Sequence, residues 1–360
     1  MLDFTSSLYL GFWHDSWSLR PWGQLTTGVP AALASPPGVQ AVAASLARLQ
    51  GCDRASLGPS TFHLFWDLFG MLASEGIAVY VDQGAYPIAR WGTAHAALRG
   101  VLVRQFSHRD AGALQQMVVQ SPGLRPVVVA DGVCACCGSP LPIEAYLAAI
   151  RPGGGLLVLD DTQALGILGH SPGPEAPYGR GGGGTLRRRG VSGRDLILVC
   201  SLAKAFGAPL AALSGSRDLV ERFEATGETR VHCSPPSAAA IHAAARALAL
   251  NQARGDDLRR QLARRVRFFR ERLAAAGLPG TGGLCPIQRL LPLPTAVARE
   301  LHERLLASGV RTVLQPCSMG DTARITFVLT ARHRADAIDR AVGVLAGLAL
   351  ALPWIQPQRG

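Results

Sequence analysis

The sequence predicts an α/β fold, with a mostly parallel central sheet flanked by helices and a smaller α+β domain at the C-terminal end. Short apolar runs at 77–81, 126–130, 156–159 and 196–200 are bounded by polar turn residues, which is typical of buried strands in a parallel sheet. Between residues 37 and 50 the apolar positions recur at helical spacing instead. This alternation of strand and helix favours a doubly wound sheet.

The remaining elements follow in chain order. Ser60 is a natural N-cap for a helix that runs to Leu72, and a helix is expected at 142–150. A further strand is expected at 210–214, after the run at 196–200. Two helices are expected beyond it, an Ala-rich one at 237–250 and one at 256–275 whose arginines form a solvated basic face.

Composition limits the class of protein. The chain has 360 residues, of which 48% are hydrophobic and 17% charged, so it can bury a large core and is not broadly disordered. The expected division is an N-terminal segment at 1–35, a large domain at 36–235 and a small C-terminal domain at 236–360. The net charge of +11 favours acidic partners, but no nucleic-acid-binding module is present, so no nucleic-acid partner is expected.

Metal binding and membrane insertion are not expected either. Cys134, Cys136 and Cys137 lie close together, but zinc sites need pairs with C-x₂-C-type spacing. The apolar tail at 341–355 is shorter than the roughly 20 residues of a spanning helix, so it predicts a buried helix. Dispersed cysteines without a signal peptide predict reduced thiols and a cytoplasmic protein.

An acid and an amine follow neighbouring strands of the predicted sheet. Asp160 ends the run at 156–159, and Lys204 follows the run at 196–200. Ligands of open α/β sheets bind beyond the carboxyl ends of the strands. A lysine that forms a Schiff base and an aspartate that keeps a pyridine nitrogen protonated suit pyridoxal phosphate. Taken singly, Asp160 would be interpreted as a residue that caps a loop and Lys204 as a solvated side chain. The pair favours the cofactor, because Ser201 lies three residues before Lys204 and Gly207 three residues after it.

These two segments carry a family resemblance. Leu159–Gly166 and Ser201–Gly207 resemble the V-D-D-A-H-G-x-G and T-x-G-K-x-x-G motifs of the α-oxoamine synthases, such as 8-amino-7-oxononanoate synthase and 2-amino-3-ketobutyrate ligase. These belong to the fold-type I, aspartate aminotransferase-like pyridoxal-phosphate enzymes. The resemblance implies Lys204 as the Schiff-base lysine, Asp160 as the pyridinium partner and Ser201 as a phosphate ligand. It also implies a homodimer, because cofactor sites of this fold type borrow groups from both subunits.

Three more cofactor ligands are implied by the same resemblance. Ser60 and Thr61 stand where the family has S-G-Y/F, at a helix N-terminus whose free N–H groups can hold a phosphate. Simple capping by Ser60 is the alternative. Ser234, or His232, could supply the hydroxyl-type contact to the phosphate that relatives provide from the neighbouring subunit.

The chain departs from the family around the cofactor ring. Gln163 replaces the histidine that bonds the ring hydroxyl, and a glutamine can donate a hydrogen bond but cannot carry a proton. Tyr86 replaces the histidine that stacks on the ring, and its aromatic face can do the same. Asp131 keeps an acid near the site, whereas Ala135 takes the place of a serine. His108 matches a family histidine that is more often structural.

The chain also departs where relatives bind the amino-acid carboxylate. Arg324 aligns with the first arginine of the family's R-x-R-I-T segment and is, with Asp131, a candidate substrate-binding residue. Thr326 takes the place of the second arginine, and a hydroxyl cannot match a bidentate arginine contact. Leu8 falls near the place of a carboxylate-binding asparagine. The cofactor is therefore expected to be kept and the usual substrate set changed.

One insertion-like loop stands out at 171–192. It contains four consecutive glycines and the basic run at 186–190, so it is expected to be mobile. Its arginines, Arg187 to Arg189, could contact a phosphate-bearing group; a disordered insertion is the alternative.

Three functions remain open. The first is condensation of an amino substrate with an acyl thioester, on coenzyme A or an acyl carrier protein, in a specialised biosynthetic pathway. Lys204 would hold the cofactor as a Schiff base before the substrate binds, and its amine, once free, would carry the substrate proton. The second is an aminotransferase, lyase or racemase on the same fold. The third is a non-catalytic paralogue that binds a partner, which predicts no covalent cofactor.

Overall fold

The computed structural model describes residues 1–14, 23–317 and 321–351, and these form two compact units. The small unit comprises Met1–Gly11, Cys137–Ser139 and the chain from Asp257 onward; the large unit comprises Phe12–Cys136 and Pro140–Asp256. The boundary thus falls at Asp256 and Asp257, inside a helix, where the sequence suggested 235 and 236. Parts of the expected N-terminal segment and C-terminal domain lie at 15–22, 318–320 and 352–360, outside the described residues.

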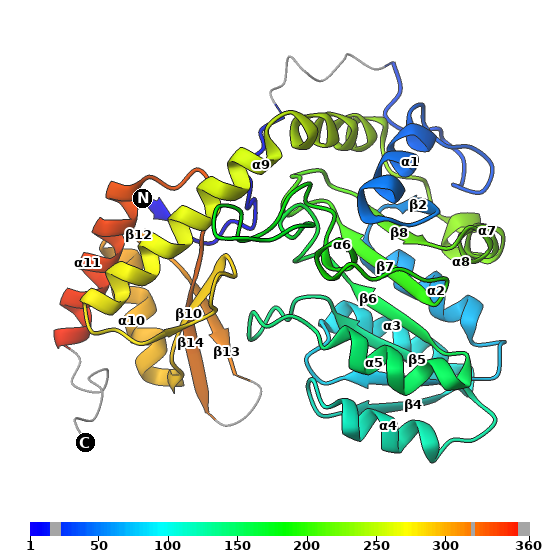
Figure 1. Ribbon diagram of the computed structural model, residues 1–360. Helices are drawn as coiled ribbons and strands as arrows, with labels where there is room; N and C mark the ends of the chain where they lie inside the picture. The colour runs from blue at the N-terminus through cyan, green and yellow to red at the C-terminus, as the bar shows by residue number, and fades with distance from the viewer. Residues whose placement is uncertain (15–22, 318–320, 352–360) are drawn as a thin grey trace. The chain divides into compact units, whose positions relative to one another are not determined.

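A seven-stranded sheet forms the centre of the large unit (Figure 1). Its strands, in spatial order, are β2 (Arg54–Gly58), β8 (Ala211–Gly215), β7 (Leu196–Ser201), β6 (Leu156–Asp160), β5 (Arg125–Asp131), β3 (Ile77–Asp82) and β4 (Leu102–Phe106). β8 is antiparallel to both of its neighbours, whereas the other adjacent pairs are parallel. The predicted mostly parallel sheet is confirmed.

Helices cover both faces of this sheet. They are α1 (Val39–Gln50), α2 (Thr61–Leu72), α3 (Pro87–Leu98), α4 (Ala111–Val119), α5 (Ile143–Ile150), the short α6 (Thr185–Arg189), α7 (Arg217–Thr226) and α8 (Glu228–His232), with a 3₁₀ turn at Arg151–Gly153. Val127 and Val129 belong to the core shared with α2, α3 and α7, and Val128 to the core shared with α4 and α5. Strands buried on both faces need continuous apolar runs, and this is why those runs were visible in the sequence.

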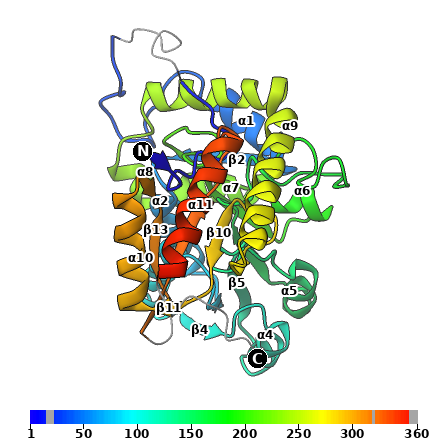
Figure 2. The same ribbon diagram turned by 90° about the vertical axis from the view of Figure 1, so that its left-hand side faces the viewer.

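The small unit contains an antiparallel sheet. Its strands are β9 (Gly280–Thr281), β10 (Ile287–Leu290), β14 (Thr322–Val328), β11 (Leu293–Pro294) and β13 (Val313–Pro316), and β1 (Leu2–Asp3) pairs separately with β12 (Val310–Arg311). α10 (Thr295–Ala307), α11 (Ala335–Ala351) and the second half of α9 (Ala238–Ala275) lie on one face of it (Figure 2). On that face the Phe327 and Phe269 rings lie 5.1 Å apart. Ala323, Ile325 and Phe327 alternate along β14 and are almost fully buried.

Two sequence predictions about helices need correction. The helices expected at 237–250 and 256–275 are one continuous helix, α9, because a single interior glycine such as Gly255 costs a helix only about 1 kcal/mol. Arg259 on this helix is only 2% exposed, so its basic face is not wholly solvated. The apolar tail forms α11, whose Val342 and Leu345 are buried, as expected; residues 352–355 lie outside the described residues.

Among the described residues, no helix combines the length and the hydropathy that crossing a membrane requires.

The insertion at 171–192 is folded, not mobile as the sequence suggested. Left-handed glycines, among them Gly181 and Gly182, turn the chain back on itself. The Gly181 N–H donates to Asp256 at 2.9 Å, and the Asn251 amide donates to the Gly181 carbonyl at 2.9 Å, so the loop is fixed to α9. Sequence patterns do not reveal such contacts, because their partners lie about 70 residues away.

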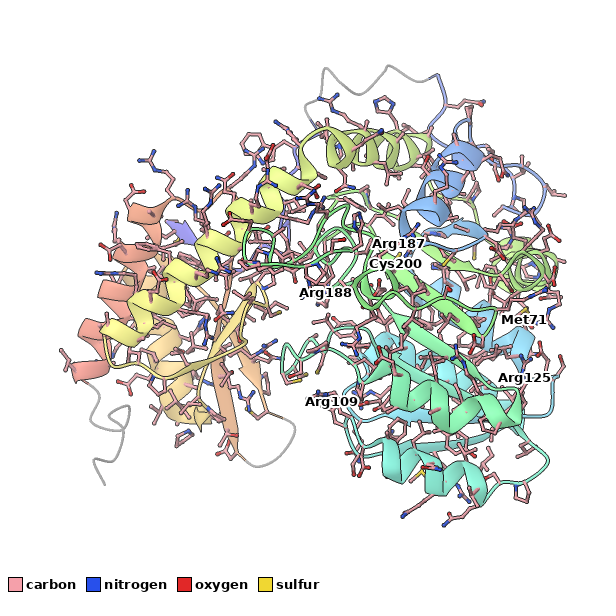
Figure 3. All side chains as sticks on the ribbon, in the orientation of Figure 1. Met71, Arg109, Arg125, Arg187, Arg188 and Cys200 are labelled. Carbon is pink, nitrogen blue, oxygen red and sulfur yellow. The ribbon has the colours of Figure 1, made fainter. Side chains whose placement is uncertain are left out.

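The arginines of this loop have partners within the large unit. Arg187 and Arg188, labelled in Figure 3, extend from α6. Arg187 donates to the carbonyls of Leu49 at 3.1 Å and Arg48 at 2.7 Å, and Arg188 donates to the Pro177 carbonyl at 2.9 Å. These contacts give the basic run a structural role in holding α6 and the loop.

Candidate active site

One cavity of about 190 Å³ opens at the carboxyl edge of the large sheet. It lies where β5, β6 and β7 end, because Asp131, Asp160 and Ser201 are the last residues of these strands. Its lining consists of Thr61, Tyr86, Asp131, Ala135, Asp160, Thr162, Gln163, Ser201 and Lys204. The structure thus brings most of the sequence-predicted site residues to one place.

Asp160 is held firmly at the end of β6. Its Oδ1 accepts the Thr162 N–H at 3.0 Å, and the Thr162 Oγ1 accepts the Ser201 N–H at 3.0 Å. Burial raises the pKa of Asp160, while the hydrogen bonds from Thr162 and the charge of Lys204 act in the opposite direction. Thr162 was not singled out from the sequence. Thr162 follows Asp160 by two residues, which is a typical spacing for an Asp side chain that accepts a backbone N–H.

Lys204 lies on a tight turn that follows β7. The Leu202 N–H donates to the Leu210 carbonyl at 2.9 Å, and the Gly207 N–H donates to the Lys204 carbonyl at 3.2 Å. Gly207 has a φ of 61°, which suits glycine and closes the turn. The Lys204 Nζ lies 5.6 Å from the centroid of the Tyr86 ring, over its face. The cavity therefore presents an amine and an aromatic face to the same space.

Lys204 is also the only lysine of the chain. The sequence contains 36 lysines and arginines, and every other one is an arginine. An arginine cannot lose its proton and act as a nucleophile, whereas a lysine can. The single lysine in this cavity therefore favours the prediction that its amine serves chemistry rather than charge alone.

Asp131 orients the loop that carries Tyr86. Its Oδ1 accepts the Tyr86 N–H at 3.0 Å, and it lies directly opposite Asp160 in the sheet register. Burial first, and then the charge of Asp160, raise the pKa of Asp131 well above its usual range. Asp82 also holds this loop. Its carboxylate accepts hydrogen bonds from the Gly84 N–H, the His108 ring and the Tyr146 hydroxyl, each at 2.6 Å. This contact gives His108 the structural role that the sequence suggested.

The N-terminus of α2 borders the cavity through Thr61. The Ser60 side chain does not cap this helix, contrary to the alternative expected from sequence, because its Oγ pairs with the His63 Nδ1 at 2.8 Å. The first-turn N–H groups are therefore not capped by that side chain. Such groups, with the positive end of the helix dipole, form a typical site for a phosphate.

A second aspartate lies behind the cavity. Asp161 is fully buried and accepts the Thr185 N–H at 3.0 Å, which fixes the start of α6. Gly132 and Gly184 allow this approach: a Cβ at these positions would lie 2.4 and 1.9 Å from the carboxylate oxygens of Asp161. Burial raises the pKa of Asp161 to about 7. Asp161 is therefore a structural acid, unlike its neighbour Asp160.

These buried carboxyls predict an unusual pH dependence of stability. The pKa values of Asp131, Asp160 and Asp161 are raised, so at mildly acidic pH the folded cofactor-free protein binds more protons than the unfolded chain. Its free energy of unfolding should then fall as pH rises from about 4 to about 7, by about 1.4 kcal/mol per pH unit for one such carboxyl. Urea unfolding at several pH values would measure the slope. Asp161→Asn should flatten it, and an unchanged slope in that variant would contradict the assignment.

Three predicted site residues do not line this cavity. Ser60 lies next to it at the α2 N-terminus. Ser234 lines a separate small cavity of about 20 Å³, together with Gly58 and His63. Arg324 lies on β14 in the small unit. Roles for these residues stay predictions.

The residues around the cavity fit pyridoxal phosphate. Lys204 offers the amine, Asp160 the acid for a ring nitrogen, Tyr86 an aromatic face, and the α2 N-terminus with Ser201 an anion site. Burial raises the pKa of Asp160 because it disfavours the charged carboxylate, and a cationic ring nitrogen beside it would act in the opposite direction.

Comparison with known proteins agrees with this geometry. A family model described as aminotransferase class I and II matches residues 41–345. The 8-amino-7-oxononanoate synthase of Methylococcus capsulatus is 31% identical over 315 residues, which cover 86% of this chain and 76% of that protein. The 8-amino-7-oxononanoate synthase 1 of a Polaromonas species is 29% identical over 368 residues, covering 97% and 87%.

Solved structures show the same fold. The serine palmitoyltransferase of Sphingomonas wittichii superposes with a TM-score of 0.85 at 18% identity, covering 98% of this chain and 88% of that one. The 8-amino-7-oxononanoate synthase of Francisella tularensis superposes with a TM-score of 0.75 at 19% identity, covering 98% of each chain.

The sheet with one reversed strand, and the lysine and aspartate at its carboxyl edge, define a fold-type I pyridoxal-phosphate-dependent enzyme. The chain belongs to the aminotransferase class I and II family and, within it, to the α-oxoamine synthases.

Proposed function

We propose that this protein condenses an amino substrate with an acyl thioester, carried by coenzyme A or an acyl carrier protein, in a biosynthetic pathway. The observation that carries the proposal is the convergence of Lys204, Asp160 and Tyr86 on one cavity. The curated relatives that match most of the chain are named 8-amino-7-oxononanoate synthases, and a solved structure with the same fold is named a serine palmitoyltransferase. Pyridoxal phosphate, when bound, supplies the electron sink for such chemistry.

The residues of the chain divide the remaining work. Lys204 would hold the cofactor through its Nζ, and the same amine, when free, would carry a proton. Asp160 keeps the ring nitrogen protonated, and Tyr86 supports the ring by stacking. The Ser201 hydroxyl and the α2 N-terminus, including Thr61, hold the phosphate. Gln163 donates a hydrogen bond to the ring oxygen.

None of the nine described residues that line this cavity is a histidine. The groups that remain are Lys204, Tyr86, Asp160 and Asp131. The pKa of Asp131 is raised well above its usual range, mainly by burial, so this carboxyl keeps a proton at a higher pH than an exposed aspartate does. It is the best-placed second proton carrier, and it also fixes the Tyr86 backbone.

The products that the protein forms distinguish condensation from the alternative functions. Condensation should release one free thiol per turnover from an acyl thioester, and a thiol reagent would measure it. An aminotransferase would instead convert the bound cofactor to pyridoxamine phosphate with an amino donor alone. A protein that neither releases thiol nor changes its cofactor with any amino donor would favour the non-catalytic alternative.

We further propose a homodimer. An exposed apolar patch comprises Phe62 on α2, Trp91 and Leu98 on α3, and Val231 on α8, which are 38%, 57%, 83% and 49% exposed. α2 packs against both α3 and α8, so the helices that carry these exposed side chains are neighbours. A patch of this kind on a protein in water is typical of an interface. It also lies on the helix whose N-terminus borders the cavity.

Sedimentation equilibrium tests this. The wild-type protein should sediment with twice the chain mass, and Trp91→Glu combined with Val231→Glu should shift it to the monomer. Val119→Glu on α4, at a side chain that is 72% exposed, is the matched control and should leave the dimer intact. A monomeric wild type would refute the proposal.

We also propose that the protein is cytoplasmic, because acyl thioesters of coenzyme A and acyl carrier protein are found there.

A further inference from the structure

Thr162 lies in the wall of the cavity and joins the ends of two strands there. The last paired residues of the parallel strands β6 and β7 are Asp160 and Val199, and the Asp161 N–H donates to the Val199 carbonyl at 2.8 Å. Ser201 lies beyond this last pair, and its backbone N–H donates to the Thr162 Oγ1 at 3.0 Å. A side chain thus continues the connection between the two strands after their backbone pairing has ended.

Thr162 also holds the carboxylate of Asp160. Its backbone N–H donates to the Asp160 Oδ1 at 3.0 Å, and the Thr162 side chain forms a further hydrogen bond with the same acid. A hydroxyl can accept one hydrogen bond and donate another, so the Thr162 hydroxyl can accept from Ser201 and donate to Asp160. An O–H group whose oxygen accepts from an N–H is the better donor, because hydrogen bonds in a chain polarise one another.

The carboxylate of Asp160 needs these hydrogen bonds because it is buried. Asp160 is 6% exposed, and burial, the largest effect on its pKa, raises that pKa by disfavouring the charged form. Hydrogen bonds from the side chain and backbone of Thr162 lower the pKa of Asp160, and the charge of Lys204 acts in the same direction. The contacts with Thr162 belong to the fold itself, so they are in place before any cofactor binds.

We infer that Thr162 is a positioning residue for pyridoxal phosphate: its hydroxyl keeps Asp160 as an oriented carboxylate for the ring nitrogen and ties it to the strand end from which the Lys204 turn begins. Thr162 acts through Asp160 and carries no proton of the reaction itself. All of these residues belong to the large unit. The inference depends on the cofactor and its ring nitrogen, and not on the proposed condensation with an acyl thioester.

The first test compares two cofactors that differ in one ring atom. Pyridoxal phosphate and its 1-deaza analogue, in which a C–H group replaces the ring nitrogen, are titrated into the cofactor-free protein, and binding is followed by absorbance. Thr162→Val keeps the branched shape but removes the hydroxyl, so it should weaken the binding of pyridoxal phosphate by roughly 10-fold through the loss of a hydrogen bond to a charged group. Binding of the deaza analogue should change by less than about 2-fold, because no ring nitrogen then meets Asp160.

Two control variants separate this role from a general loss of structure. Thr162→Ser keeps the hydroxyl and should bind both cofactors as the wild type does. Ser214→Ala also removes a buried hydroxyl from the same sheet: Ser214 donates to the Gln50 Oε1 at 2.7 Å and does not line the cavity. It should lower the thermal unfolding temperature but leave the ratio of the two affinities unchanged. If Thr162→Val does not fold, Thr162→Cys serves in its place, because a thiol is only a weak donor and acceptor.

The second test observes the ring nitrogen directly. Pyridoxal phosphate labelled with ¹⁵N in the ring gives a nuclear magnetic resonance shift that differs between the protonated and the neutral ring. Bound to the wild type and to Thr162→Ser, the nitrogen should give the shift of the protonated form, and in Thr162→Val it should move towards the neutral form. Neither test needs turnover, so a protein that releases no thiol would refute the proposed condensation and leave both tests standing.

Three outcomes would overturn the inference. One is an equal loss of affinity for pyridoxal phosphate and for its deaza analogue in Thr162→Val, which would leave Thr162 with a purely structural role. Another is a ring-nitrogen shift in Thr162→Val that equals the shift in the wild type. The last is a Thr162→Ser variant that behaves like Thr162→Val, because the methyl group and not the hydroxyl would then be the part that matters.

Discussion

Replacing Lys204 with alanine should abolish the covalent attachment of pyridoxal phosphate and lower turnover by at least about 10³-fold. The amine at this position serves both as the attachment point and as the proton carrier, and no other lysine exists to replace it. The wild-type protein should show a visible absorbance band with added cofactor, and borohydride should bleach it and fix the cofactor to the chain.

The measurement has an unusually clean readout in this protein. After reduction, peptide mass mapping should find the cofactor only on the peptide that contains Lys204, since the sole other amine is the N-terminus. Lys204→Arg is the matched control: it keeps the positive charge near Tyr86 but should give neither band nor label. The same band in wild type and Lys204→Ala would remove the catalytic lysine and favour a protein that only binds the cofactor.

The second large effect is expected at Asp160. Asp160→Asn keeps the shape of the side chain but cannot hold a cationic ring nitrogen, so turnover should fall on the order of 10²- to 10³-fold while the Lys204 linkage still forms. Single-turnover kinetics with an amino substrate would measure the loss at the step that removes the proton.

Asp161→Asn provides the comparison within the same dipeptide. Asp161 is more deeply buried than Asp160, but it bonds to Thr185 and does not line the cavity. Its replacement should change stability and its pH dependence far more than the chemical step. Equal losses of turnover in the two variants would show that Asp160 acts through the fold and not through the cofactor.

Much of the fold could be predicted because its signals are local. The strands β3, β5, β6 and β7 are buried on both faces, so they appear in the sequence as continuous apolar runs. The end of each run then gives the position of Asp131, Asp160 and Ser201 at one edge of the sheet. This geometry follows from the parallel arrangement alone, and the cavity confirms it.

What could not be predicted depends on distant partners. The fixation of the glycine-rich loop by Asn251 and Asp256 joins segments about 70 residues apart. Ser60 pairs with His63 and does not form the helix cap that the sequence offered as an alternative to a cofactor contact.

The single lysine has a practical consequence. A protein grown with lysine labelled with ¹⁵N at the side-chain nitrogen would contain one labelled lysine nitrogen, on a residue that lines its cavity. Its nuclear magnetic resonance signal would need no assignment, and the ionisation of that amine could be followed directly as substrates are added.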